Sequence, residues 1–418
     1  MLGVTGLWHN PQFVRLWAAQ TVSHLGSQVT LLALPLTAVL VLGASPAEMG
    51  VLGAAEFVPW MLVGLFAGVW VDRLRRRPIL IAADLGRALL LLTVPLAAML
   101  GQLSLPLLYA VAFLAGTLSV FFEVAYNAIL PSLVRRDELV EGNSKLLASA
   151  SAAEIAGPGL AGALVQLVTA PVAVALDAVS YIASALFVSF IRADEPRAAP
   201  RNERSVVREV REGLGALLRD PLLKSLVVAS TASNVVFAVH GTLRVLYATR
   251  DLRLEPVLLG LVLGVGSIGG LGAALMSGRV ARQFGLGPTI VATEVLIGVG
   301  GLCFPLAGGP VPVAAGVLAL GMVFVSMGAM TYVITVGSLR QSVTPHRLQG
   351  RVSASARFIS RSAIPVGAIV GGLLGEWLGL RLTLGLASAG SLLIALYLWL
   401  SPVGPVREAP RAQEDDGL

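Results

Sequence analysis

Charged residues and cysteine are both scarce in this chain of 418 residues. Only 13% of the residues are charged, whereas 56% are hydrophobic, and the mean hydropathy is +0.82. A water-soluble globular protein carries far more charged surface than this. Cys303 is the only cysteine, so an intrachain disulfide bond is excluded. The composition therefore predicts a membrane protein that crosses the bilayer many times.

The sequence motifs of several enzyme classes are also missing. There is no P-loop, no Ser/His/Asp spacing typical of hydrolases, and no His/Cys cluster with metal-ligand spacing. The net charge of +6 could suggest a nucleic-acid partner, but the arginines fall between apolar segments rather than on an aromatic-interleaved surface. We therefore expect no catalysis, no cofactor, no ATP hydrolysis and no binding of nucleic acid.

Twelve segments are apolar and long enough, at about 20 residues, to cross a membrane as helices. With the N-terminus in the cytoplasm, most of the 30 Lys and Arg residues fall on the cytoplasmic side, as the positive-inside rule requires. Both termini are then cytoplasmic, and we expect the inner membrane as the location. The segments are 13–42, 48–70, 79–100, 104–129, 145–167, 171–191, 222–247, 256–278, 288–308, 311–337, 352–376 and 381–400.

An internal repeat relates the two halves of the chain. A shift of 210 residues lays Gly50 on Gly260, Pro78 on Pro288, and Asp84 on Glu294. Such a parallel repeat predicts two six-helix bundles. We expect these domains at 1–191 and 222–401, a cytoplasmic linker at 192–221 and a disordered tail at 402–418. Apolar residues recur at helical spacing from Val206, so the linker should contain an amphipathic helix that lies along the cytoplasmic membrane surface, either as a strut between the halves or as a simple tether.

The loop 68–78 reads Gly-Val-Trp-Val-Asp-Arg-Leu-Arg-Arg-Arg-Pro and resembles the Gly-x-x-x-Asp-Arg-x-Gly-Arg-Arg signature of the major facilitator superfamily. Arg75 stands where that family usually has glycine. Further motifs resemble its macrolide-efflux and enterobactin-exporter branch, and they begin at Asn10-Pro11, Asp84-x-x-Arg87, Leu130-Pro131, Leu139 and Gly157-Pro158. The resemblance implies an all-α membrane protein with twelve transmembrane helices, in two bundles related by a pseudo-two-fold axis.

Carboxylates inside predicted spans are candidates for proton coupling. An ionisable group within the membrane is costly and is retained mainly where it faces a cavity or a partner. Burial there disfavours the charged form and prepares a carboxyl group to bind and release a proton. The candidates are Glu56, Glu123 and Glu154, with hydrogen bonds between helices as the structural alternative. Asp177 and Tyr181 are interpreted as a packed polar pair.

Polar residues on other spans are candidates for the substrate cavity. Gln20, His24 and Gln28 recur every four residues on the first span and share one face. By the resemblance, this span and the fourth, seventh and tenth line the cavity. The further candidates are Asn127, Asn234, His240 and Tyr332.

The basic loop and its surroundings are predicted to form a cytoplasmic gate. Asp72 would face the start of the eleventh span, near Arg357 and Arg361, in one of two conformations. Asp84 and Arg87 should lie near the cytoplasmic end of their span, within reach of the loop. The gate residues are Gly68, Asp72, Arg73, Arg76, Arg77, Asp84, Arg87, Arg357 and Arg361.

The sequence thus favours a secondary transporter that exports amphiphilic small molecules, drug-like or siderophore-like, as a proton antiporter with alternating access. Multidrug resistance is the expected phenotype. A lipid or lysolipid translocator with the same fold is one alternative, and a non-transporting membrane sensor or scaffold is another. The expected partners are the substrate, protons and membrane lipids, and we expect a monomer.

Overall fold

The computed structural model of the chain describes residues 6–192 and 206–408. Within these ranges the side chains of residues 65, 66, 69, 72, 73 and 206–210 lie outside the description. Contacts between helices divide the chain into two units. Unit 1 comprises Met1–Pro200 with Leu254–Gly264, and unit 2 comprises Arg201–Arg253 with Val265–Leu418.

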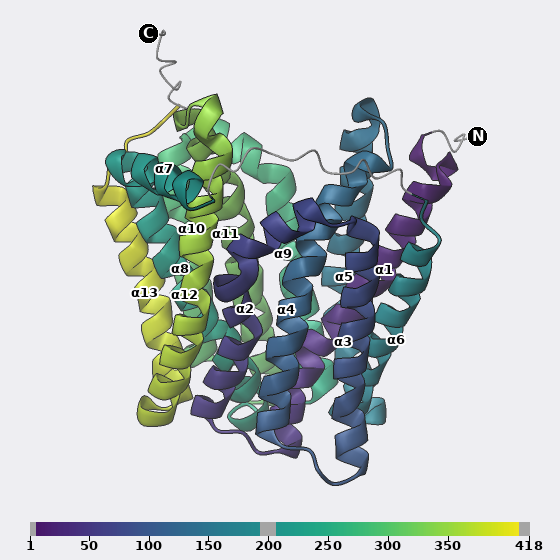
Figure 1. Cartoon of the computed structure of the whole chain (residues 1–418). Helices are drawn as coiled ribbons and strands as arrows, with labels where there is room; N and C mark the ends of the chain where they lie inside the picture. The colour runs from purple at the N-terminus through teal and green to yellow at the C-terminus, as the bar shows by residue number, and fades with distance from the viewer. Residues whose placement is uncertain (1–5, 193–205, 409–418) are drawn as a thin grey trace, which may run out of the picture. The chain divides into compact units, whose positions relative to one another are not determined.

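The helices of unit 1 follow one another with short connections (Figure 1). The first membrane helix, α1, continues into a π-helical turn at Thr37–Val41 before the chain reverses. The elements are η1 (Leu7–His9), α1 (Pro11–Leu36), α2 (Pro46–Arg73), α3 (Arg76–Met99), α4 (Leu105–Ile129), η3 (Leu130–Ser132), η4 (Arg136–Glu138), α5 (Leu139–Val168) and α6 (Ala170–Ser189).

The remaining elements begin with one short helix, α7, which has no counterpart in the first half, and long helices follow it. The start of α9 belongs to unit 1 and the rest of these elements belong to unit 2. They are α7 (Val206–Arg219), α8 (Pro221–Arg250), α9 (Pro256–Phe284), α10 (Leu286–Leu306), α11 (Val311–Val343), η5 (His346–Leu348), α12 (Gln349–Leu378) and α13 (Leu380–Leu400).

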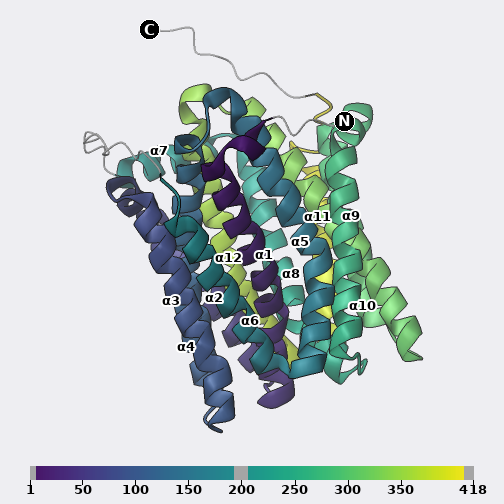
Figure 2. The same ribbon diagram turned by 90° about the vertical axis from the view of Figure 1, so that its right-hand side faces the viewer.

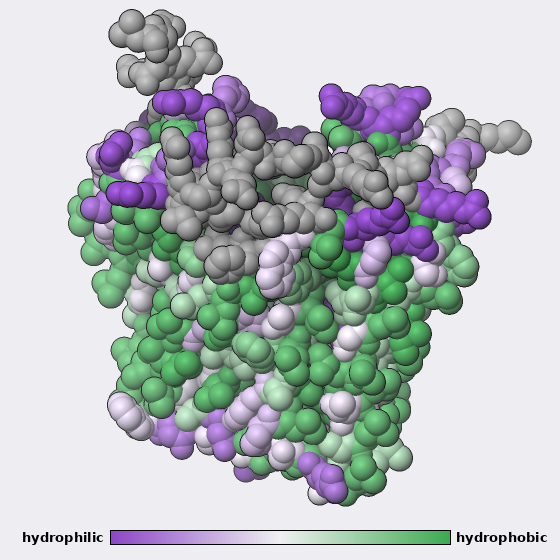
Figure 3. Space-filling model, viewed as in Figure 1, coloured by the Kyte–Doolittle hydropathy of each residue, from purple (hydrophilic) through white to green (hydrophobic). Residues whose placement is uncertain are grey.

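Among the described residues, eleven helices are long and apolar enough to cross a membrane. The other long helix is α2, whose side chains are described only in part. The predicted all-α fold with twelve membrane helices is confirmed. In the view of Figure 3, hydrophobic residues cover the flanks of the helices and hydrophilic residues gather near helix ends. The helices α9 and α11 extend beyond their predicted spans, to Phe284 and Val343, by roughly 1.7 turns each.

The internal repeat reappears in the way the helices begin. Asn10 caps α1 and Asp220 caps α8, exactly 210 residues later, and each side-chain oxygen accepts hydrogen bonds from two backbone N–H groups. Pro46 and Pro256 open α2 and α9 in the same register. The two halves therefore use the same local signals to start equivalent helices.

The packing scheme within the units repeats as well (Figures 1 and 2). In unit 1, α1 packs on α5 and α6, while α3 packs on α4 and α6. In unit 2, α8 packs on α12 and α13, while α10 packs on α11 and α13. Buried apolar residues such as Phe13 and Leu80 fill the first core, and Ile290 and Leu398 fill the second.

Glycines form a close seam within unit 1, between α5 and the start of α9. A methyl group added at Gly260 would lie 2.2 Å from the carbonyl oxygen of Pro158, and one at Gly162 would lie 2.2 Å from that of Pro256. Small residues are typical of membrane helices whose backbones approach closely. The close helix crossing expected near Gly157-Pro158 is therefore present.

The linker helix α7 packs on α12 and α8 of unit 2. Glu212 forms an ion pair with Arg351 at the start of α12. Gly213 of α7 also packs closely on α12, since a methyl group added at Gly213 would lie 2.6 Å from the Arg351 carbonyl oxygen. Leu217 is fully buried among apolar residues of α8 and α12. The predicted helix forms and has a defined docking site, whereas residues 193–205 of the linker lie outside the description.

The expected disordered tail does not begin at residue 402. Val403 is fully buried in the apolar core of unit 2. The backbone N–H groups of Leu286 and Gly287 donate to the carbonyl oxygens of Arg407 and Val406. These bonds satisfy donors at the start of α10 that have no partner within the helix. Residues 402–408 are therefore ordered, and 409–418 lie outside the description.

Candidate functional site

Asp84 and Arg87 of α3 form an ion pair in the interior of unit 1. Asp84 is 0% exposed and Arg87 is 5% exposed. Because an α-helix rises 1.5 Å per residue, Arg87 lies roughly 16 Å from the start of α3, close to its middle. The expected position of this pair, near the cytoplasmic end beside the basic loop, is therefore corrected. Its gating role stays a prediction.

Arg87 connects three helices. Its guanidinium carbon lies 4.3 Å from the ring centroid of Phe122 on α4 and 4.0 Å from that of Tyr181 on α6. Its Nη1 donates to the Ser119 hydroxyl on α4 at 3.5 Å. Aromatic faces attract a cation most strongly where water is excluded. The positive charge is thus held by one carboxylate and two rings.

Asp177 of α6 is the second fully buried acid of unit 1. The Ser180 hydroxyl donates to its Oδ1 at 2.8 Å. A methyl group added at Gly26 of α1 would lie 2.5 Å from the same oxygen, so a glycine is needed where α1 passes the carboxyl group. The Tyr181 hydroxyl lies 2.9 Å from the Ser27 hydroxyl. Asp177 and Tyr181 are both packed, as expected, but each has its own partner.

We call Asp84, Arg87 and Asp177 the buried charge cluster. Several polar atoms in and beside it have no hydrogen-bond partner among the described residues, although buried polar groups are normally paired. These atoms are Asp84 Oδ2, Asp177 Oδ2, Arg87 Nε and Gln20 Nε2.

The three polar residues predicted to share one face of α1, namely Gln20, His24 and Gln28, lie in different surroundings. Gln20 is almost fully buried, at 2% exposure, inside unit 1. His24 is half-buried and lies within electrostatic reach of Arg87. Gln28 packs against α5, where a methyl group added at Gly157 would lie 2.5 Å from its Cβ atom. Gln20 and Gln28, two of the three cavity candidates on α1, are therefore packed within unit 1.

The three predicted proton-coupling carboxylates have exposed side chains on α2, α4 and α5. On α4, Glu123 and Asn127 share an exposed face. At 3.6 residues per turn, this face lies about 180° from the exposed apolar side chain of Leu114. On α2, the backbone of Glu56 packs on Gly116 of α4, and its side chain is exposed. Glu154 is also exposed, near the middle of α5.

The gate residues of unit 1 are described in part. Gly68 lies in the last turns of α2, while the side chains of Asp72 and Arg73 lie outside the description. Arg76, which is half-buried, begins α3. Arg77 donates to the carbonyl oxygen of Ser189, at the end of α6.

Basic side chains near a helix C-terminus compensate the unpaired carbonyl groups and the partial negative charge there. Both Arg77 and Arg15 compensate the C-terminus of α6 in this way, and Arg15 donates to the Phe190 carbonyl oxygen at 2.6 Å. In unit 2, Arg357 and Arg361 are exposed on α12. The observed contact of Arg77 caps a helix, and the predicted gate involving Asp72, Arg357 and Arg361 stays a prediction.

The candidates in unit 2 link helices to one another. The Tyr332 hydroxyl lies 3.0 Å from the Ser230 hydroxyl, between α11 and α8. The Asn234 side chain donates to the Ser360 carbonyl oxygen at 2.9 Å, between α8 and α12.

Glu294, the counterpart of Asp84 in the repeat, is 0% exposed and accepts a hydrogen bond from Ser233. Ile297 occupies the position that corresponds to Arg87. Unit 2 therefore keeps the buried acid at this position without the arginine three residues later.

His240 and Arg244 on α8 are also directed toward neighbouring helices. The Nε2 atom of His240 lies 3.2 Å from the Ser388 hydroxyl on α13, and the ring lies 5.4 Å from that of Phe304 on α10. Among the described residues, His240 Nδ1 and Arg244 Nε are buried atoms without a hydrogen-bond partner.

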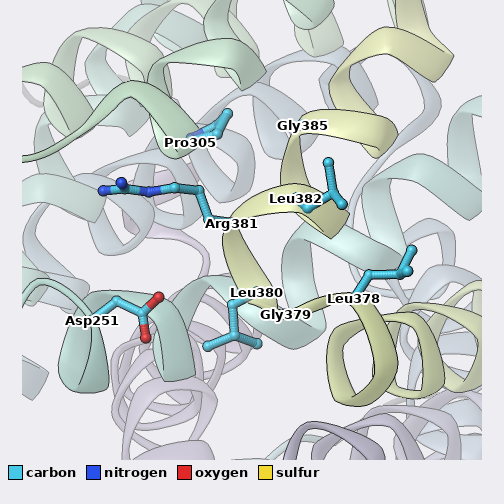
Figure 4. A pocket seen from close by; sticks show the side chains of 8 residues that line it. All are labelled: Asp251, Pro305, Leu378, Gly379, Leu380, Arg381, Leu382 and Gly385. Carbon is cyan, nitrogen blue, oxygen red and sulfur yellow. The ribbon is translucent and has the colours of Figure 1, made fainter.

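A depression of about 530 Å³ lies in unit 2, beside the start of α13 (Figure 4). Arg381 lines it and donates to the Ala307 carbonyl oxygen at 2.9 Å and to the Tyr247 hydroxyl at 3.3 Å. Partial burial raises the pKa of Asp251 above its ordinary value, and the charges of Arg381 and Arg250 act against this. Because its arginine already joins helix ends, we do not assign the substrate to this depression.

The buried charge cluster cannot be recognised as a unit from the sequence. Its members stand in two separate motifs, Asp84-x-x-Arg87 and Asp177-x-x-x-Tyr181. The i,i+3 spacing gave the ion pair, but nothing in the linear sequence shows that α3 and α6 pack together. A glycine on α1 opposite two polar residues of α6 is the further signal, and it is visible only once the helices are paired.

Comparison with known proteins gives one family. Residues 16–368 match the sequence profile of the Major Facilitator Superfamily. The chain is 28% identical over 410 residues to "Multidrug efflux pump Tap" of Mycolicibacterium fortuitum, covering 96% of this chain and 97% of that protein. It is 25% identical over 410 residues to "Macrolide efflux protein A" of Streptococcus pyogenes, covering 95% and 97%.

A solved structure gives the same fold. The crystal structure of the nucleoside transporter NupG superposes with a TM-score of 0.78 at 13% sequence identity. The superposition covers 93% of this chain and 98% of that chain. At this identity the likeness concerns the fold alone.

Proposed function

The chain belongs to the Major Facilitator Superfamily, and from this we propose that it exports amphiphilic small molecules in exchange for protons. It is a multi-pass integral membrane transporter. The observation that carries the proposal of export is the match to two efflux proteins over nearly the whole length of the chain. Both are named for small-molecule efflux, and one of them for macrolides.

The exposed carboxylates of unit 1 support proton coupling. Glu56 and Glu154 lie well within helices whose other exposed side chains are largely apolar, which is an expensive position for a charge unless water or substrate reaches it. Glu123 lies on the face of α4 away from Leu114, as expected of a residue directed to a polar cavity. Alternating protonation of such groups could couple proton entry to substrate exit.

The substrate preference follows from the same charges. Unit 1 has several acids within its spans, so a cavity lined by them would attract cationic or neutral amphiphiles and reject anions. Asn234 and Tyr332 would then contribute to the cavity from unit 2 only if helices move apart, because both are bonded to neighbouring helices in this conformation. Such movement is an expected part of alternating access.

We further propose that the protein lies in the inner membrane with both termini in the cytoplasm. Arg75, Arg76, Arg135 and Arg136 lie at or between helix ends on one side of the predicted topology, and Arg282 repeats this placement near the end of α9. The bias of positive charge toward one side supports this orientation.

The test uses purified protein in liposomes and three amphiphiles, namely ethidium, tetraphenylphosphonium and erythromycin. We expect Glu56→Gln, Glu123→Gln or Glu154→Gln to abolish uptake driven by a pH gradient while exchange of labelled for unlabelled substrate persists. Glu376→Gln, at the end of α12, is the control and should keep both activities. The carboxylate assignment is rejected if all three variants retain full gradient-driven uptake.

A further inference from the structure

The buried charge cluster combines two acids with one base in the interior of unit 1. Asp84 and Asp177 are both 0% exposed, and Arg87 is 5% exposed. If both carboxyl groups were ionised, the cluster would carry a net negative charge without a counter-ion. Burial of an uncompensated carboxylate is so unfavourable that the group normally takes up a proton instead.

The contacts distinguish the two acids. Asp84 is paired directly with the Arg87 guanidinium, which donates to its Oδ1. Asp177 receives a hydrogen bond from the neutral Ser180 hydroxyl, and its Oδ2 has no partner among the described residues. A charge-assisted pair stabilises an ionised carboxylate far better than neutral hydroxyl groups do. The excess proton therefore belongs on Asp177.

The surrounding groups do not supply a second counter-ion. On α1, the Thr30 hydroxyl is a neutral hydrogen-bonding group at Asp177, and His24 is within electrostatic reach of Arg87. On α3, Asp84 adds negative charge and Arg87 is already paired. Tyr181 on α6 is bonded to Ser27. Among the described residues of α5, no titratable group acts on Asp177.

Arg87 is positioned to form an ion pair with either Asp84 or Asp177. Its guanidinium lies over the Tyr181 ring at 4.0 Å, and Tyr181 is one helical turn from Asp177 on the same face of α6. A rotation of the Arg87 side chain could therefore exchange Asp84 for Asp177 as its partner. The rings of Phe122 and Tyr181 would continue to hold the charge during this exchange.

We propose that Asp177 is a proton-binding site, protonated in this conformation, and that Arg87 becomes its counter-ion when the proton leaves. In that step the O–H bond of Asp177 breaks, the proton passes to water, and the resulting carboxylate pairs with Arg87. The use of this site in transport rests on the proposed antiport, whereas the presence of the proton does not. Asp177 is fully buried, whereas Glu56, Glu123 and Glu154 are exposed.

Infrared spectroscopy of the purified full-length protein in detergent tests this assignment without any substrate. A protonated carboxyl group has a carbonyl-stretch band that a carboxylate lacks, and labelling aspartate with ¹³C shifts only the aspartate bands. We expect one ¹³C-sensitive band of a protonated aspartate at neutral pH. It should be absent from Asp177→Asn and present in the control Asp137→Asn, whose side chain is exposed.

Three results would overturn the proposal. They are a wild-type spectrum with no protonated aspartate band, a band that persists in folded Asp177→Asn, and a band that sodium chloride removes while choline chloride does not. The last result would indicate a sodium site. A wild-type spectrum without the band rejects the proposal even if Asp177→Asn fails to fold.

A transport measurement then links the proton to coupling. In liposomes, Asp177→Asn should lose substrate uptake driven by a pH gradient, by at least tenfold, and keep substrate exchange. If the wild-type protein shows no gradient-driven uptake of any of the three amphiphiles, the proposed antiport fails while the infrared result still decides the proton site. If Asp177→Asn retains full gradient-driven uptake, the proposed coupling role of this proton fails.

Discussion

Thr169 has a backbone conformation that is poorly suited to its side chain. It precedes α6 with φ 83° and ψ 155°, a region that β-branched residues rarely occupy. Gly379, 210 residues later, precedes α13 with φ 82° and ψ 157°. The two halves thus make the same turn between helices, once with glycine and once with threonine.

This pair gives a reciprocal prediction of stability. Thr169→Gly should stabilise the protein by about 1–3 kcal/mol, because glycine adopts this conformation without strain. Gly379→Thr should destabilise it by a similar amount. The thermal unfolding midpoint of the purified protein, followed by intrinsic fluorescence, measures both. Equal midpoints for Gly379→Thr and wild type would show that the turn does not constrain its residue.

The sequence singles out individual polar residues better than it predicts their environments. Glu56, Glu123 and Glu154 are unusual because a carboxylate within an apolar run has few explanations, and all three are exposed. Their role in proton coupling stays a prediction. Asn234 and Tyr332 instead bond to neighbouring helices. Asp84 and Arg87 lie deeper than expected. Helical spacing gives the face that a residue shares, but the partner helix depends on long-range packing.

The linker helix α7 shows the same limit for a whole element. Its periodic apolar residues predicted an amphipathic helix, and Val206–Arg219 is helical. The ion pair between Glu212 and Arg351 and the burial of Leu217 dock the end of α7 on unit 2, so the expected position on the membrane surface is corrected. The pattern alone does not distinguish a membrane surface from a protein surface, because both accept an apolar face. A role of α7 as a strut or as a tether stays a prediction.

Neighbouring leucines of α7 provide a matched test of this docking. Leu217 is 0% exposed and Leu218 is 53% exposed. Leu217→Ala should destabilise unit 2 by about 2–5 kcal/mol through the lost packing and the remaining cavity. Leu218→Ala should change stability by about 0.5 kcal/mol or less. Thermal unfolding and protease sensitivity of the linker distinguish the two variants, and an equal response would argue against the docked helix.

For the whole molecule, the repeat of 210 residues explains the architecture, and the departures from it concern charge. Helix starts, caps and packing recur in both units. Asp84 has Glu294 as its counterpart, yet Arg87 corresponds to Ile297 and Asp177 to Ala387. The repeat could be found from the sequence because prolines and glycines mark equivalent turns. The asymmetric cluster could not, since its members become neighbours only after folding.

This asymmetry assigns different tasks to the halves in our account. Unit 1 holds the exposed glutamates and the buried charge cluster, so we propose it as the half that responds to protons. Unit 2 contributes polar residues that join its helices and would shape the substrate pocket when those helices separate. The central claim is therefore that substrate export and proton entry are one coupled process.

The most direct test drives protons with a substrate gradient. Wild-type protein is reconstituted in liposomes that contain a pH-sensitive dye, with equal pH inside and outside, and ethidium is added to the outside. Antiport predicts that ethidium entry expels protons and makes the lumen alkaline, because coupled gradients drive each other reciprocally. A protonophore should abolish the change, and protein-free liposomes should show none. Ethidium uptake at an unchanged internal pH would contradict the account.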